Sequence, residues 1–304
     1  MIRGIPIGQL RLPAGLDLDA SLARFSRYGD DLMDRWDGQS FLRPYRIEGE
    51  VGAVRLRRTA TGTSLEVEST PEPSQPALPA RLQSMFVDEQ APLLALARRD
   101  PVIARLLELH PGVFPVRALD PLGALLAMVT AQQVNLTLAL SVRREILQRL
   151  GQRIALGDDF VICPDPERMA AAPPDVWAEV HFTRAKARCL VALGMAVCRG
   201  ELDFEELELA SDDEVRARLT ELPGLGPWTA SQYLTRVQGR AVVVADDLGV
   251  RKAVQLAYGL AQMPLSSEVL ELTSDYGRAA FSAQQLLLYH LSRMGRTPTI
   301  VTPA

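Results

Sequence analysis

The sequence is poor in cysteine and histidine, and each shortage excludes a class of site. The three cysteines include no CxxC pair, so neither a disulfide framework nor a four-thiolate iron–sulfur cluster is available. The three histidines, His110, His181 and His290, do not show the spacing of zinc ligands. We therefore expect no iron–sulfur cluster and no zinc, and we interpret each histidine as an ordinary surface or core residue.

Long hydrophobic runs are also missing. No stretch of 18 apolar residues occurs, and the N-terminus lacks the apolar core of a signal peptide. We therefore expect a cytoplasmic protein without a membrane partner. The net charge of −4 argues mildly against a general nucleic-acid coat protein. The basic stretch 184–199 could still meet phosphates, although a solvated helix face explains it equally well.

The remaining pattern indicates an α+β chain of two domains. Residues 52–58 and 63–68 alternate apolar with polar positions, which predicts a β-hairpin with one buried face. Four prolines within residues 71–79 then exclude helix and central strand. We predict a small mixed domain with an antiparallel sheet over 1–79 and a helical domain over 80–304. Almost everything after Pro79 is helical in pattern, with helices expected at 120–133, 135–150, 165–172, 174–180, 184–198, 212–220, 227–238, 248–258, 266–275 and 278–294.

The most informative stretch is the hairpin that Leu222 to Gly226 form between two predicted helices. Its two glycines, Gly224 and Gly226, permit positive φ and a close backbone approach. Pro227 then suits the first turn of a helix. The free N–H groups of that helix favour an anion, and such a hairpin can clamp one phosphate diester without reading sequence.

Two aspartates follow at the start of the helix predicted over 248–258. We expect Asp246 to be its N-cap, which leaves Asp247 facing outward at the first turn. A carboxylate beside a phosphate clamp is electrostatically unfavourable. A reaction that develops positive charge on the sugar would explain its presence.

Residues 222–230, LPGLGPWTA, and residues 243–253, VVADDLGVRKA, resemble the signature of the HhH-GPD superfamily of DNA base-excision glycosylases. The resemblance extends over residues 115–294 and is nearest to the 3-methyladenine DNA glycosylase II (AlkA-like) branch. It implies a mostly helical glycosylase domain, and the segment before Pro71 is similar in size and pattern to the N-terminal sheet domain of that branch.

The resemblance also assigns roles to residues. It makes Asp247 the catalytic aspartate, which stabilises an oxocarbenium-like sugar and orients a water, although a purely structural cap is the alternative. Trp228 would line the base pocket or else be a core residue. Gln132 and Gln133 would fill the gap left by a flipped base or else be surface caps. The expected DNA-binding residues are Gln132, Gln133, Leu222, Gly224, Gly226, Thr229 and Lys252.

The sequence departs from that branch in the expected pocket. Gln232 stands where an aromatic residue is usual, Tyr276 replaces a tryptophan, and the usual arginine falls on Ala280. A pocket with fewer large rings should be wider. The sequence does not select one alkylated base among the candidates.

Lysine is scarce, and this bears on the reaction. Bifunctional relatives carry a lysine at the position of Trp228, whereas this sequence has only Lys186 and Lys252. We therefore predict a monofunctional glycosylase that removes alkylated purines from duplex DNA by base flipping, acting as a monomer at the nucleoid. A non-catalytic lesion-binding protein is the alternative, and an adenine-mismatch or oxidised-guanine glycosylase is a third. The resemblance allows a monovalent cation at the hairpin carbonyls when DNA is bound.

Overall fold

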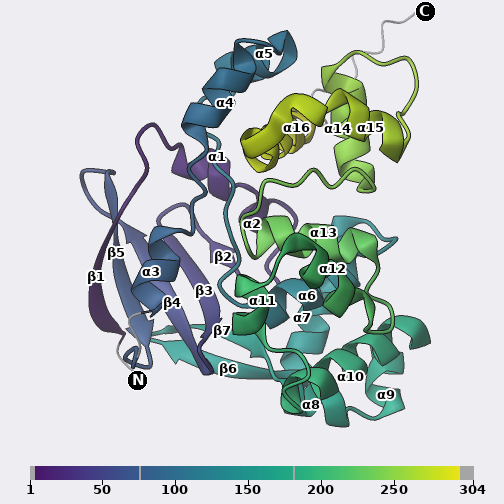
Figure 1. Cartoon of the computed structure of the whole chain (residues 1–304). Coiled ribbons are helices and arrows are strands. Elements are labelled where there is room, and N and C mark those ends of the chain that lie inside the picture. The colour runs from purple at the N-terminus through teal and green to yellow at the C-terminus, as the bar shows by residue number, and fades with distance from the viewer. Residues whose placement is uncertain (1–3, 75–76, 181, 295–304) are drawn as a thin grey trace, which may run out of the picture. The chain divides into compact units, whose positions relative to one another are not determined.

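The computed structural model describes residues 4–74, 77–180 and 182–294 (Figure 1). The chain divides into two compact units. The first comprises residues 1–12, 22–86 and 116–238, and the second comprises 13–21, 87–115 and 239–304. The domain boundary expected after Pro79 falls inside the first unit. A separate domain over 1–79 stays a prediction.

The first unit contains a five-stranded antiparallel sheet with strand order β1-β5-β4-β3-β2. Its core includes Phe41, Leu56 and Leu65, none of which is exposed. The hairpin predicted from the alternating pattern is confirmed, because β4 and β5 pair antiparallel. The strands are β1 (Ile5–Arg11), β2 (Arg35–Trp36), β3 (Ser40–Ile47), β4 (Glu50–Arg58) and β5 (Ser64–Thr70).

A second hairpin, β6 (Gly151–Leu156) and β7 (Asp159–Pro164), corrects the expectation that nearly everything after Pro79 is helical. Its strands are short, and they are stabilised by contacts with distant residues that periodicity does not show. Val161 of β7 packs with Leu42 and Ala53 of the large sheet. Arg55 donates to the carbonyl oxygen of Leu156 at 2.6 Å and pairs with the carboxylate of Asp159 at 2.8 Å. The hairpin is therefore fixed to the sheet by both apolar and charged contacts.

The helices of the first unit follow the predicted pattern after residue 120. Asp120 caps α6 by accepting from the N–H of Leu122, and Pro121 occupies the first turn. The helices are α2 (Arg24–Arg27), α3 (Ala77–Gln83), α6 (Pro121–Ala131), α7 (Leu136–Leu150), α8 (Pro166–Ala171), α9 (Pro174–Glu179), α10 (Arg184–Cys198), α11 (Phe204–Leu209), α12 (Asp212–Thr220) and α13 (Pro227–Arg236).

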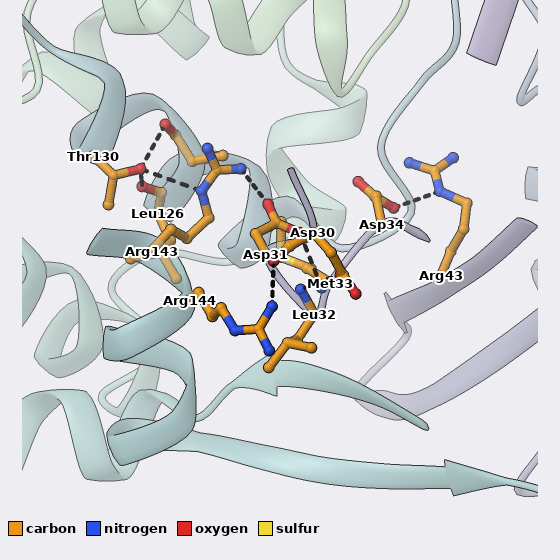
Figure 2. A network of polar contacts seen from close by, with 11 residues as sticks. Asp30, Asp31, Leu32, Met33, Asp34, Arg43, Leu126, Thr130, Arg143 and Arg144 are labelled. Carbon is orange, nitrogen blue, oxygen red and sulfur yellow. Dashed lines mark hydrogen bonds and ion pairs between the residues drawn. The ribbon is translucent and has the colours of Figure 1, made fainter. Parts of the chain in front are cut away.

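A buried polar network joins α6 and α7 to the segment before β2 (Figure 2). Arg143 on α7 pairs with Asp31 at 2.7 Å and donates to the hydroxyl of Thr130 on α6 at 3.3 Å. Arg144 donates to the carbonyl oxygen of Asp30 at 3.0 Å. Burial raises the pKa of Asp31, and the Arg143 guanidinium opposes that shift. The network therefore ties α6 and α7 to each other and to residues 30–31.

The second unit is helical and has one apolar core, which includes Leu93, Val254 and Ala283. The helix expected over 266–275 ends at Leu272 and is followed by a 3-10 helix in which Gly277 has φ of 47°. No described helix is long and apolar enough to cross a membrane. The elements are α1 (Leu18–Leu22), α4 (Gln90–Ala97), α5 (Pro101–Leu109), α14 (Leu248–Ala257), α15 (Ser266–Leu272), η1 (Ser274–Ala279) and α16 (Ala280–Met294).

Candidate functional site

The glycine hairpin lies between α12 and α13, where the sequence predicted it. The N–H of Leu225 donates to the carbonyl oxygen of Leu222 at 3.1 Å and closes the turn. Gly224 has φ of 87°, and a Cβ at this position would lie 2.9 Å from the Cβ of Cys189. Only glycine fits there without a shift, for both reasons. The hairpin therefore packs closely on α10.

Of the two glycines that permit positive φ, only Gly224 adopts it, and Gly226 does not. Its φ is −101°, and it is the N-cap of α13 without a side-chain cap. A Cβ at this position would meet nothing within 4 Å. The absent side chain leaves open space in front of the first turn of α13. A phosphate contact at this helix start stays a prediction.

The other predicted residues of α13 differ in exposure. Trp228 is half-buried, whereas Thr229 is 1% and Gln232 is 4% exposed. The side-chain oxygen of Gln232 accepts from the Nε of Arg236 at 2.7 Å. Gln232 is thus part of the interior of the first unit, and a role for it or Trp228 in a base pocket stays a prediction.

The loop 132–135 joins α6 to α7 and lies against the hairpin. The side-chain nitrogen of Gln132 donates to the carbonyl oxygen of Gly224 at 3.0 Å and lies 3.5 Å from the hydroxyl of Thr229. The structure thus brings three predicted DNA-binding residues together. Gln133 is exposed, with φ of 56°. For a residue other than glycine this conformation is uncommon, and it lies directly after the C-cap of α6.

Lys186 is a residue of this region that the sequence did not identify. Its ammonium donates to the carbonyl oxygens of Gln132 at 2.7 Å and Thr130 at 3.3 Å. A cation at the C-terminal end of α6 is favoured by the helix dipole and satisfies carbonyls that the helix leaves open. Partial burial lowers the pKa of Lys186. The sequence placed Lys186 in the basic stretch 184–199 and showed it to be one of two lysines, but neither observation indicates this contact, because a lysine spaced for it looks like any other helix lysine.

In the second unit, the structure corrects the assignment of the two aspartates. Asp247, not Asp246, is the N-cap of α14, and its carboxylate accepts from the N–H of Val250 at 2.9 Å. Asp246 is exposed within the turn. The N–H of Asp247 donates to the carbonyl oxygen of Val244 at 3.0 Å, and this turn places the cap one residue later than expected.

The residues around Asp247 leave room for its carboxylate. A Cβ on Gly249 would lie 2.9 Å from the bonded oxygen of Asp247. Glycine at the first turn therefore lets the carboxylate fold over the start of α14. Asp247 itself is partly exposed, and Lys252 on the same helix is exposed.

Tyr276 lies in the core of the second unit with 3% of its surface exposed. Its hydroxyl is 2.7 Å from that of Tyr258, which in turn donates to Asp100. Burial raises the pKa of Tyr276. The structure describes a hydrogen-bonded core tyrosine, and its part in a base pocket stays a prediction.

Two of the histidines meet, which their sequence separation did not indicate. The Nε2 of His110 lies 2.9 Å from the Nδ1 of His290. Within the described ranges, no group of three or more histidine, cysteine, aspartate or glutamate side chains is placed to hold a metal ion. His181 lies outside the described residues.

No profile of a known protein family matches the chain. The DNA-3-methyladenine glycosylase of Bacillus subtilis (strain 168) is 25% identical over 188 residues, which are 61% of this chain and 62% of that protein. DNA-3-methyladenine glycosylase 2 of Escherichia coli (strain K12) is 24% identical over 152 residues, 49% of this chain and 53% of that protein. The chain thus spans less than two thirds of the length of either relative.

The solved structure of a 3-methyladenine DNA glycosylase from Archaeoglobus fulgidus superposes with a TM-score of 0.82 at 21% identity, and the match covers 94% of this chain and 99% of that one. At this identity the likeness establishes the fold. The predicted α+β class and the resemblance to helix–hairpin–helix DNA glycosylases are therefore confirmed.

Proposed function

We propose that this protein is a monofunctional DNA glycosylase that hydrolyses the N-glycosidic bond of alkylated purines in duplex DNA. The observation that carries the proposal is the N-cap geometry of Asp247, whose carboxylate is held by the N–H of Val250 at 2.9 Å within the segment that resembles the glycosylase signature. The similarity to 3-methyladenine glycosylases supports alkylated purines as the substrate class.

The reaction breaks the bond between C1′ of the sugar and the purine nitrogen. Alkylation makes the base cationic, so the base leaves as a neutral molecule and takes the bonding electron pair with it. Positive charge then develops on the sugar, where the carboxylate of Asp247 stabilises it. Asp247 also orients the water whose oxygen adds to C1′, which leaves an abasic site and releases one proton. The start of α14 keeps the carboxylate oriented before the substrate arrives.

The first unit supplies duplex binding in this proposal. The hairpin at Gly224 and Gly226 holds a phosphate through backbone N–H groups, and Gln133 enters the duplex where the damaged nucleotide has been flipped out. The ring of Trp228 stacks on the cationic base, for which an aromatic face is suited. The second unit adds one contact in this proposal, because Lys252 binds a phosphate from its exposed position on α14.

Strand cleavage through a Schiff base is not expected. It needs an uncharged amine beside the sugar. The ammonium of Lys186 is engaged with the carbonyl oxygens of Gln132 and Thr130, and Trp228 stands where bifunctional relatives have their lysine. Borohydride trapping with abasic DNA should therefore yield no covalent protein–DNA adduct.

The proposal is tested by incubating wild-type protein and Asp247→Asn with methylated duplex DNA and measuring the released bases by chromatography. Asparagine can still accept from the N–H of Val250, so the helix start should be retained. We expect the rate of base release to fall about 100-fold or more, because the negative charge is lost. Asp246→Asn is the matched control, since it removes the neighbouring exposed carboxylate.

Release by neither protein, with duplex binding retained, would contradict the enzyme and support a non-catalytic lesion-binding protein. Equal release by the wild type and Asp247→Asn would show that another carboxylate acts. Release of 8-oxoguanine instead of methylated purines would move the substrate to the oxidised bases.

A further inference from the structure

The loop that carries Asp247 has little regular structure of its own. Residues 239–247 lie between α13 and α14 and form neither helix nor strand. The backbone of such a segment depends on partners outside it to satisfy its N–H groups. What fixes this loop therefore determines how well Asp247 is oriented.

Gln284 on α16 provides such a partner. Its side-chain oxygen accepts from the N–H of Val244 at 2.6 Å, and Gln284 is 2% exposed. Val244 is 1% exposed as well. The bond is thus shielded from water, where losing the acceptor would leave a buried N–H group unsatisfied. A glutamine inside an apolar core carries a desolvation cost that this bond offsets.

Two further hydrogen bonds connect Val244, which Gln284 holds, to the carboxylate of Asp247 and the start of α14. The carbonyl oxygen of Val244 accepts from the N–H of Asp247 at 3.0 Å, and the carboxylate of Asp247 accepts from the N–H of Val250 at 2.9 Å. Gln284 therefore fixes the first residue of the turn whose last residue is Asp247. Apolar packing of Val244 and Ala245 is not directional, so it does not by itself fix the orientation of the turn 244–247.

We propose that Gln284 is a positioning residue for Asp247: by holding the N–H of Val244, it sets the turn 244–247 and with it the direction of the catalytic carboxylate. The inference rests on the proposed function for its catalytic consequence, whereas its structural part concerns the turn itself. Gln284 touches neither substrate nor reacting atoms in this role. A neutral amide suits the position, because a buried carboxylate there would add a second negative charge near Asp247.

The test compares Gln284→Met with Gln285→Met. Methionine matches glutamine in length and volume but has no comparable acceptor, so the core stays filled. Gln285 is the neighbouring buried glutamine on the same helix, 9% exposed. We expect Gln284→Met to lower the single-turnover rate of base release about tenfold through misplacement of the carboxylate. Affinity for the duplex should stay unchanged, and Gln285→Met should leave both quantities near the wild-type values.

A double-mutant cycle separates positioning from general loosening. In an Asp247→Asn background, Gln284→Met should produce no further loss of rate, because its effect passes through the missing carboxylate. An equal tenfold loss in both backgrounds would overturn the proposal. So would a wild-type rate in Gln284→Met.

Hydrogen exchange tests the structural part without any activity. In Gln284→Met, the amides of Val244, Asp247 and Val250 should exchange faster, whereas Gln285→Met should leave them protected. Unchanged protection of Asp247 and Val250 in Gln284→Met would overturn the proposal. If the wild type releases no base from any duplex, the proposed function fails, and this measurement still decides the role of Gln284.

Discussion

The hairpin region of the first unit and the Asp247 loop of the second are held in different ways. Charged side chains support the hairpin region. The ammonium of Lys186 donates to the carbonyl oxygen of Gln132 at 2.7 Å, and Arg143 on α7 pairs with Asp31. A neutral amide, Gln284, and backbone bonds support the turn that ends at Asp247. The difference suits the proposed tasks, because a phosphate-binding surface gains from nearby cations, whereas a carboxylate that must remain anionic gains from defined direction.

The largest effect is expected when one charge of the first region loses its partner. Arg143→Met leaves the buried carboxylate of Asp31 unpaired, which should lower the free energy of unfolding by about 3–5 kcal/mol. Urea unfolding would measure the loss. The double variant Arg143→Met/Asp31→Asn should recover part of it, because no buried charge then remains. A loss below about 1 kcal/mol in the single variant would show that the pair is solvated and not structural.

The two hairpin glycines offer a matched pair with a smaller effect. Gly224→Ala places a Cβ at a residue with left-handed backbone, 2.9 Å from the Cβ of Cys189. It should lower the free energy of unfolding by about 2 kcal/mol, or, if the hairpin shifts to relieve the clash, weaken duplex binding by the same free energy. Gly226→Ala adds a Cβ at φ of −101° into open space, and because alanine is a poorer N-cap than glycine it should cost about 0.5–1 kcal/mol in the free protein. Thermal unfolding and fluorescence anisotropy with a duplex would measure both. Equal effects would contradict the different roles of the two glycines.

Loss of the Lys186 contact should lower the free energy of unfolding by about 1 kcal/mol. Lys186→Met removes the charged donor from the carbonyl oxygens of Gln132 and Thr130, and partial exposure reduces the loss. If the loop 132–135 directs Gln133 into the duplex, 2-aminopurine fluorescence beside an abasic site should report about fivefold less flipped nucleotide. Lys252→Met is the comparison variant: it removes the exposed lysine proposed to contact a phosphate, so it should lower duplex affinity but leave the flipped fraction unchanged at saturating protein. Equal losses of flipping in both variants would indicate a general charge effect.

These residues also show how far the sequence could be read. The hairpin, the aspartate pair and most helices after Asp120 were predictable because local spacing and the resemblance specify them. Lys186 and Gln284 were not, because each acts through contacts with residues more than 30 positions away in sequence. The β6–β7 hairpin was missed for the same reason, since Arg55 and Leu42 of the distant sheet hold it. The cap lies at Asp247 and not at Asp246 because the turn closed by the N–H of Asp247 and the carbonyl oxygen of Val244 ends one residue later than the spacing indicated.

The smallest predicted effect concerns the histidine pair of the second unit. Burial, His290 and Arg293 lower the pKa of His110 below its ordinary value of 6.5. Above pH 6.5 the group is neutral in both folded and unfolded protein and contributes nothing. As the pH falls below 6.5, the unfolded chain binds a proton that the folded chain refuses, so stability decreases down to the lowered pKa. Because His110 is still partly exposed to solvent, the loss should be only a few tenths of a kcal/mol. Urea unfolding at pH 7.5 and 5.5 should therefore show a smaller decrease for His110→Gln than for the wild type, and an identical decrease in the two proteins would place the titration elsewhere.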